Sequence, residues 1–377
     1  MASEARAKRV CSQCQEALQW DAAAGQLRCQ ACGAEHAVEP VGQISEHDLE
    51  EALAQRKARG PIGTGSRLIR CVTCQAEVEL PDEIQATRCE FCRSALVLPF
   101  TASEDHYLPE SLIPFAIDRT HAERAFARWL RGLWFRPRNL RQAASLTQLH
   151  GVYIPYWAFG CEVTTRWTAD AGYIHYEDKR VKTEQGEETR RVAHTRWEPC
   201  RGERHDPFED HLLCASRGLL QELSGDVQRF DTSGLLPYSS EYLLGFSAER
   251  YAIDLKQAWQ SARIELSESQ TSRCLQDIPG DTQRNVRTTH QFQRVRFKHV
   301  LLPMWIAAYE YRGRVHRFLV NGQTGEVEGT APHSAAKIAA LVLVVVTLLA
   351  LAFYLFQPRP PKPPQSPSHS APANHPI

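Results

Sequence analysis

The sequence has neither an excess of charge nor a catalytic signature. Its 44 basic and 44 acidic side chains cancel over 377 residues, so net charge gives no argument for nucleic acid or anionic lipid as a partner. No Gly-x-Ser-x-Gly turn and no His-Glu-x-x-His motif occurs, and the 15 histidines do not cluster with cysteines or carboxylates at ligand spacing. Gly60–Gly65 has the glycine spacing of a phosphate-binding loop, but Ser66 replaces its lysine. We therefore expect no enzyme, and a linker at this point.

A secretory signal is also lacking, because Met1–Val10 carries charge with no apolar run behind it. Thiols stay reduced in the cytosol, where paired cysteines bind metal more often than they form disulfides. Eight of the 12 cysteines form two sets with the same C-x2-C-x14-C-x2-C spacing, offset by 60 residues. The eight predicted metal ligands are Cys11, Cys14, Cys29, Cys32, Cys71, Cys74, Cys89 and Cys92. The other four have no partner spacing, and we expect buried thiols at Cys161, Cys200, Cys214 and Cys274.

The spacing of each set predicts a zinc ribbon with one structural Zn²⁺. A C-x-x-C pair forms a tight turn that directs two sulfurs to one point, and two such turns on facing hairpins complete a tetrahedron. Four thiolates leave no open position for water or substrate, and modules of about 30 residues need the metal in order to fold. Redox motifs and disulfides are disfavoured by two matched sets, and iron is the main rival metal.

The charge of the ribbons favours a protein partner over nucleic acid. Residues 1–100 contain 11 basic and 14 acidic side chains, which leaves three excess negative charges. Proteins that grip phosphate usually present a basic face. Nucleic-acid binding remains the alternative.

An uncharged run near the end of the chain predicts a membrane span. Ile338–Phe356 has 19 residues without charge, proline or glycine, and as a helix it reaches about 28 Å. A buried core helix is disfavoured because no polar stripe is present and the proline-rich segment 357–377, expected to be disordered, follows at once. Flanking basic residues do not decide the orientation. The missing signal and the thiolate sites predict a single-pass inner-membrane protein with its body in the cytoplasm.

The rest of the chain predicts an α+β body. Asp118–Phe135 reads as a helix, and 177–191 as a charged, exposed excursion. YAID at Tyr251–Asp254 echoes FAID at Phe115–Asp118, and VLLPMW echoes VYIPYW, so we expect a duplicated helix-plus-antiparallel-sheet unit. The predicted domains are ribbon 1 at 1–43, a helical and flexible linker at 44–66 with Ser45 as its N-cap, ribbon 2 at 67–106, the body at 107–332 with repeats at 113–240 and 245–330, the span at 338–356 and the tail at 357–377.

The helix at Asp118–Phe135 carries many arginines between aromatic residues. It could rest on anionic headgroups or an acidic partner, or it could simply pack its apolar face on the sheet. We favour packing. The arginines are Arg119, Arg124, Arg128, Arg131, Arg136, Arg138 and Arg141.

These features together resemble a known family. Ribbon cysteines, the strings GVYIPYW (Gly151–Trp157), LLPMW (Leu301–Trp305) and NGQTG (Asn321–Gly325), and one span look like prokaryotic membrane-anchored proteins with a transcription-factor-IIB-type zinc ribbon. Members are often labelled primosomal protein N-prime (replication factor Y) or superfamily II helicase. The resemblance covers nearly all of Cys71–Lys337. ATPase activity is not carried over, because this chain lacks the phosphate loop of the motor.

The resemblance adds an expected role to the predicted architecture. Some relatives are associated with membrane-stress modules, which implies the assembly of proteins at the inner membrane face. The first ribbon is an addition to the single ribbon usual in the family. We therefore expect a non-enzymatic, membrane-tethered adaptor that binds proteins. The alternative is a membrane-associated nucleic-acid-binding factor related to replication and without ATPase motifs.

Overall fold

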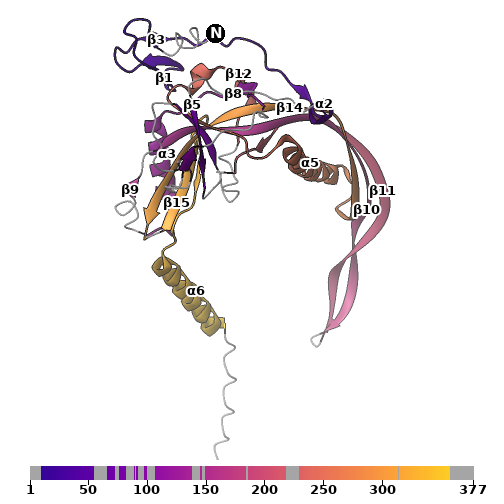
Figure 1. Cartoon of the computed structure of the whole chain (residues 1–377). Helices are drawn as coiled ribbons and strands as arrows, with labels where there is room; N and C mark the ends of the chain where they lie inside the picture. The colour runs from indigo at the N-terminus through magenta and orange to yellow at the C-terminus, as the bar shows by residue number, and fades with distance from the viewer. Residues whose placement is uncertain are drawn as a thin grey trace, which may run out of the picture.

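The computed structural model describes residues 10–54, 66–72, 76–81, 89, 91, 97–99, 107–137, 145–146, 149–183, 186–217, 229–312 and 314–356. Over these residues, helices and a large mixed sheet form the body, so the predicted α+β class is confirmed (Figure 1). The helices are α2 (Leu49–Ala54), α3 (Arg119–Gly132), α5 (Leu255–Asp277) and α6 (Ala335–Phe356), with 3-10 turns η2 (Thr232–Gly234) and η3 (Ser240–Leu243). The strands are β1 (Leu18–Asp21), β2 (Gln26–Cys29), β3 (Glu35–His36), β4 (His47–Asp48), β5 (Ser66–Cys71), β6 (Glu77–Pro81), β7 (Val97–Pro99), β8 (Ser111–Leu112), β9 (Ser145–Leu146), β10 (His150–Thr183), β11 (Gly186–Cys214), β12 (Leu236–Pro237), β13 (Ser247–Glu249), β14 (Thr282–Tyr311), β15 (Arg314–Asn321) and β16 (Val327–Gly329).

Two antiparallel strands, β10 and β14, form the centre of the body and carry the two echoed strings. Each has a short parallel strand on its outer side: β8 lies beside β14 with Ser111 opposite Val300, and β13 lies beside β10 with Ser247 opposite Val152. Thus β8, which precedes α3, pairs with β14, which follows α5. In the same way β13, which precedes α5, pairs with β10, which follows α3. This reciprocal order is what a duplicated unit with a pseudo-two-fold relation would give.

The echoed residues make matching hydrogen bonds across this relation. The Trp157 indole N–H donates to the carbonyl of Ile253 at 2.9 Å, and the Trp305 indole N–H donates to the carbonyl of Ile117 at 2.7 Å. Each tryptophan therefore donates a hydrogen bond to the isoleucine carbonyl in the Ala-Ile-Asp string of the other unit. These contacts support the duplication, while the domain boundaries themselves stay predictions.

Beyond Gly160, the strands β10, β11 and β14 extend together out of the body and form an arm. The arm comprises Gly160–Thr183, Gly186–Phe208 and Thr282–Arg296. β14 follows β10 as far as the pair Gly172–Thr282, and β11 continues alone with β10 to the pair Thr183–Gly186. The described residues of the predicted excursion, 177–183 and 186–191, thus belong to a two-stranded ribbon, and the side chains of Glu177–Arg180 and Thr189–Arg191 are exposed. Figure 1 shows this arm curving around α5, which lies on its inner side.

Helix α5 supports the concave face of the arm. Its buried Leu266 packs with Val163 of β10, and its buried Cys274 packs with Trp167. Irregular pairing bends the strands: the register shifts near Gly160 and Ala169, and three residues nearby adopt a positive φ. These residues are Asp210 (φ 50°), Asn285 (φ 52°) and Arg294 (φ 50°).

Helix α3 packs on the sheet as an ordinary amphipathic helix. Asp118 caps its start by accepting a 2.7 Å hydrogen bond from the His121 N–H, and its apolar face buries Ala122, Phe126 and Leu130. The Phe126 ring stacks on Phe318 of β15 with centroids 3.6 Å apart. The packing interpretation of this helix is therefore confirmed for its apolar face.

The linker helix starts later than the sequence suggested. Asp48, and not Ser45, accepts the capping hydrogen bond from the Glu51 N–H at 2.9 Å. Since β4 pairs His47–Asp48 with Phe297 and Arg296 of β14, the backbone must stay extended there, and α2 begins only at Leu49.

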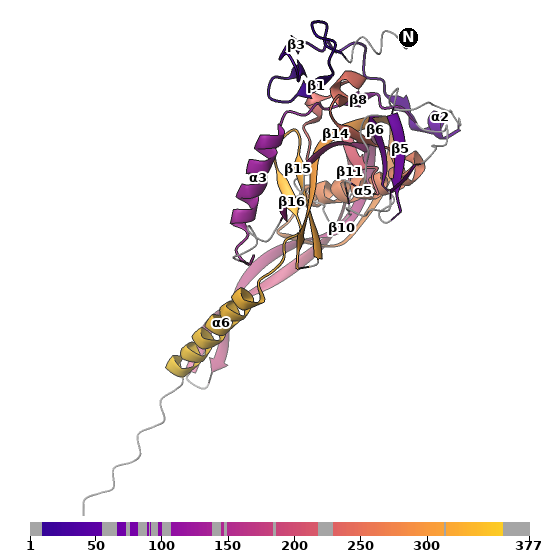
Figure 2. The ribbon, with the colours of Figure 1, turned by 60° about the vertical axis from the view of Figure 1, so that its left-hand side comes forward.

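Helix α6 covers the predicted span and begins three residues before it. Among the described residues it is the one helix long and apolar enough to cross a membrane, and none of it is buried against the body. Figure 2 shows it extending away from the sheet.

Candidate metal centre

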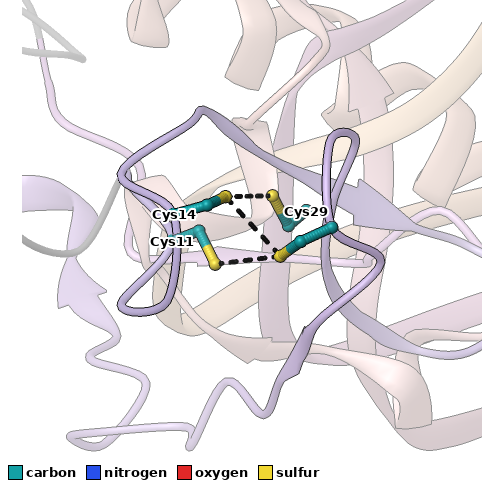
Figure 3. Close-up of side chains that lie close together, drawn as sticks. Cys11, Cys14 and Cys29 are labelled. Carbon is teal, nitrogen blue, oxygen red and sulfur yellow. Dashed lines mark hydrogen bonds between the residues drawn. The ribbon is translucent and has the colours of Figure 1, made fainter.

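The first cysteine set comes together at the tip of a small separate sheet, β1–β2–β3. The four sulfur atoms all lie within 4.8 Å of one another, so the group could hold a metal ion. The Sγ atoms of Cys14 and Cys29 are 3.3 Å apart, those of Cys14 and Cys32 are 3.5 Å apart, and those of Cys11 and Cys32 are 3.6 Å apart. Figure 3 shows the side chains of Cys11, Cys14 and Cys29 turned toward one another.

Two tight backbone turns place these sulfurs. In the first turn the Cys11 N–H donates to the Glu16 carbonyl at 2.7 Å, and in the second the Cys29 N–H donates to the Ala34 carbonyl at 2.9 Å. The residue after each second cysteine has a left-handed backbone, with φ of 63° at Gln15 and 75° at Gly33. Glycine adopts this conformation at no steric cost, whereas a glutamine there is strained unless its surroundings hold it. The turns thus direct each cysteine pair at a single point.

The donor set fits a tetrahedral thiophilic ion. With metal–sulfur bonds of about 2.3 Å, the sulfurs of a regular tetrahedron lie about 3.8 Å apart, close to the separations described here. Four thiolates at this distance would repel one another strongly without a cation between them. When bound, Zn²⁺ would supply folding energy and no reactive position, since its four ligands are all protein sulfurs.

A histidine that the sequence analysis missed lies beside the site. His36 on β3 places its Nε2 atom 3.6 Å from the Cys11 sulfur. This contact, together with nearby backbone N–H groups, lowers the pKa of the Cys11 thiol to about 6, which favours the thiolate that binds metal. The sequence feature that could have identified His36 is its position four residues after Cys32. The second cysteine set does not repeat this feature, because Leu96 lies four residues after Cys92.

One tryptophan fastens this ribbon to the body. Trp20 on β1 is 9% exposed, its indole N–H donates to the carbonyl of Phe115 at 2.9 Å, and its ring packs edge-on against Tyr242 with centroids 4.9 Å apart. The backbone N–H of Trp20 also donates to Leu244 at 3.0 Å. The ribbon is therefore docked on the body and does not hang free.

Replacing Trp20 with alanine should loosen this docking. Removing a buried tryptophan typically costs about 3–5 kcal/mol, so amides of residues 10–36 should exchange on the order of a hundredfold faster in hydrogen-exchange mass spectrometry. Trp20→Phe keeps a ring against Tyr242 and should lose only about 1 kcal/mol with the hydrogen bond. Unchanged exchange in Trp20→Ala would mean that other contacts hold the ribbon.

The second cysteine set is described only in part. Cys71 and Cys89 are both buried and share a core with Ala76 and Phe91, whereas Cys74 and Cys92 lie outside the described residues. The Cys71 N–H donates to the Ala76 carbonyl at 2.9 Å, which repeats the spacing of the two turns in the first set.

The strands around this second set join the large sheet. β6 pairs with β13 of the body through the pairs Ala248–Glu79 and Glu249–Val78, and β5 and β7 continue the sheet outward. The strands around the second cysteine set are thus built into the edge of the body, whereas the first set belongs to a separate small sheet.

The four remaining cysteines are free thiols that belong to the body. Cys161 and Cys274 are buried as expected, while Cys200 and Cys214 are half-buried. Burial raises the pKa of Cys161 to about 11 and of Cys214 to about 12, so both are protonated at neutral pH and poorly nucleophilic.

The fold and the site define an α+β protein with a four-cysteine candidate metal centre and one apolar helix after its body. No family model matches the chain. No solved structure matches it. The uncharacterized protein YdjG of Bacillus subtilis (strain 168) is 30% identical over 243 residues, which span 62% of this chain and 67% of that protein. The chain belongs to the YdjG family.

Proposed function

We propose that this protein is a membrane-tethered zinc-ribbon adaptor that recruits protein partners at the cytoplasmic face of the inner membrane. The observation that carries the proposal is the arm. Beyond Gly172 two strands extend without β14, and over the described residues β11 pairs with β10 alone, so its outer edge is open. An extended, open-edged ribbon offers backbone and side-chain contacts to another protein.

The surface of the arm suits reversible contacts with partners more than aggregation. Charged side chains lie on both strands near the tip, and charge on an edge strand discourages uncontrolled pairing. Arg191 lies 4.7 Å above the ring of Tyr176, and Arg196 lies 5.8 Å above that of Tyr173. Such pairs stiffen a two-stranded ribbon that would be marginal by itself.

Two structural zinc ions, one for each ribbon, are part of the proposal. The first is supported by the four sulfurs within 4.8 Å. The second is supported by the matching turn at Cys71 and by the burial of Cys89, with Cys74 and Cys92 proposed as the remaining ligands. Both sets consist of thiolates alone, which supports a non-enzymatic role because no ligand position is left for substrate.

The proposed tether is α6, with its N-terminal side in the cytoplasm. Thiolate sites favour a reducing compartment, and among the described residues the apolar surface of α6 is not buried against the body. The resemblance to membrane-anchored zinc-ribbon proteins points the same way, and a membrane-stress module is the kind of partner that it implies. Nucleic acid is the alternative partner, and the acidic balance of residues 1–100 weighs against it.

Shortening the arm should abolish partner recruitment. The pair Tyr176–Ala193 allows residues 177–192 to be replaced by an Asn-Gly turn that closes the same hairpin. After crosslinking in cells, detergent extraction and nuclease treatment, we expect proteins captured by the full chain to fall at least tenfold with this variant. The matched control is Ile264→Ser, an exposed position on α5 away from the tip.

Two results would contradict the proposal in different ways. Capture that survives loss of the tip would remove the arm as the binding surface. Partners that vanish from the full chain after nuclease treatment would favour the nucleic-acid-binding factor. Zinc content and membrane association of the shortened variant should equal those of the full chain, which separates lost binding from lost folding.

A further inference from the structure

Two aromatic side chains are left exposed just after α3. Trp134 is 84% exposed and Phe135 is 39% exposed, although the preceding turns of the helix bury their apolar residues. Large aromatic side chains in this position gain little from packing on the body. Adjacent exposed aromatic side chains such as these indicate a surface that contacts a membrane or another molecule.

The same two residues are tied to the start of α6. The Phe135 carbonyl accepts a 2.6 Å hydrogen bond from the N–H of Ser334, which caps the helix, and the Trp134 carbonyl accepts a 2.9 Å hydrogen bond from the Lys337 ammonium. Since α6 begins at Ala335, the aromatic pair lies at the level where the apolar helix begins.

Tryptophan and basic side chains favour this level of a membrane. Trp rings prefer the headgroup layer at the end of a span, and Arg side chains are drawn to anionic headgroups. Exposed Arg131 and half-buried Arg136 flank the pair on either side. A count of basic residues next to the span in the sequence does not include Arg131 and Arg136. These residues lie near the start of α6 in the fold, although α3 comes about 200 residues earlier in the chain.

We infer that Trp134 and Phe135 insert into the headgroup layer of an anionic bilayer, beside the point where α6 enters it. The inference rests on the proposed membrane tether. It adds a second attachment, made by the body itself, which fixes the depth and rotation of the body at the surface. Arg131 and Arg136 contribute the electrostatic part of this attachment.

Photocrosslinking to lipid tests the inference on the full chain. p-Benzoylphenylalanine replaces Trp134, Ile264 or Leu348 in separate variants, each reconstituted in nanodiscs of phosphatidylcholine with phosphatidylglycerol and analysed for lipid adducts by mass spectrometry. Ile264 is an exposed control on α5, and Leu348 lies within the span. We expect strong adducts at 134 and 348, and at least tenfold less at 264.

The three positions separate the possible failures. Adducts at 348 with none above background at 134 would overturn the inference and leave the tether intact. No adduct at 348 would overturn the tether, and the inference with it. An adduct between position 134 and a second copy of the chain would show a protein contact instead. With Arg131→Gln and Arg136→Gln together, the yield at 134 should fall at least threefold, and an unchanged yield would overturn the role of these two arginines.

Discussion

Replacing both Cys11 and Cys29 with serine is expected to lower the zinc content from about two ions per chain to about one. These are the two buried members of the first set, and they share a core with Leu18, Trp20 and Leu27. Serine hydroxyls bind Zn²⁺ poorly, and a module this small has too little core to fold without its ion. The ribbon should therefore unfold and leave the body.

The measurements are metal analysis of the purified protein and limited proteolysis. We expect cleavage within residues 10–36 to become at least tenfold faster, while the body stays resistant. Cys200→Ser is the matched control, since Cys200 is a half-buried thiol on β11 outside both sets. A double variant that still holds two ions, or a control that loses one, would rule out the assigned ligands.

Ending the chain after Ser334 should release the protein from the membrane. This change removes the whole of α6, whose side chains are exposed in the structure and whose length matches the hydrocarbon thickness of a bilayer. After carbonate washing, we expect the amount in the membrane fraction to fall at least tenfold. The matched control ends after Phe356 and removes only residues 357–377, so it should stay in the membrane.

A tag placed after Ile377 tests the orientation of the same helix. If the body lies in the cytoplasm, protease added outside spheroplasts should remove the tag and leave the body intact. A tag that is cut only after lysis would reverse the proposed orientation. A shortened chain that remains in the washed membrane would instead show that α6 is not the tether.

Local sequence signals predicted the local features well. The cysteine spacing predicted the group that meets at Cys11, Cys14, Cys29 and Cys32, because turn geometry depends on nearby residues. The helix predicted at Asp118–Phe135 is α3, which ends at Gly132. The apolar run predicted α6.

The sequence did not predict the features that depend on pairing between strands far apart in the chain. The N-cap of α2 is Asp48 and not the predicted Ser45, because β4 pairs with β14, far along the chain. The sequence predicts only a charged excursion at 177–191. The described side chains Glu177–Arg180 and Thr189–Arg191 are exposed on both strands, so no apolar alternation marks their pairing. The strands around the second cysteine set join the body because β6 pairs with β13, and no local sequence pattern predicts this pairing.

The arm and α6 leave the body toward the same side (Figures 1 and 2), and a bilayer would treat them in opposite ways. Charged side chains near the middle of a membrane cost about 2.5–3.5 kcal/mol each on insertion scales, so exposed residues such as Glu177–Arg180 of the arm would stay outside the hydrocarbon layer that α6 is proposed to cross. The short connection from Thr330 to Ser334 must then set the angle between the helix and the body. The eleven strand pairs beyond Gly172 extend for about 36 Å, so with α6 as the proposed anchor the arm would reach that far along the membrane surface from the body.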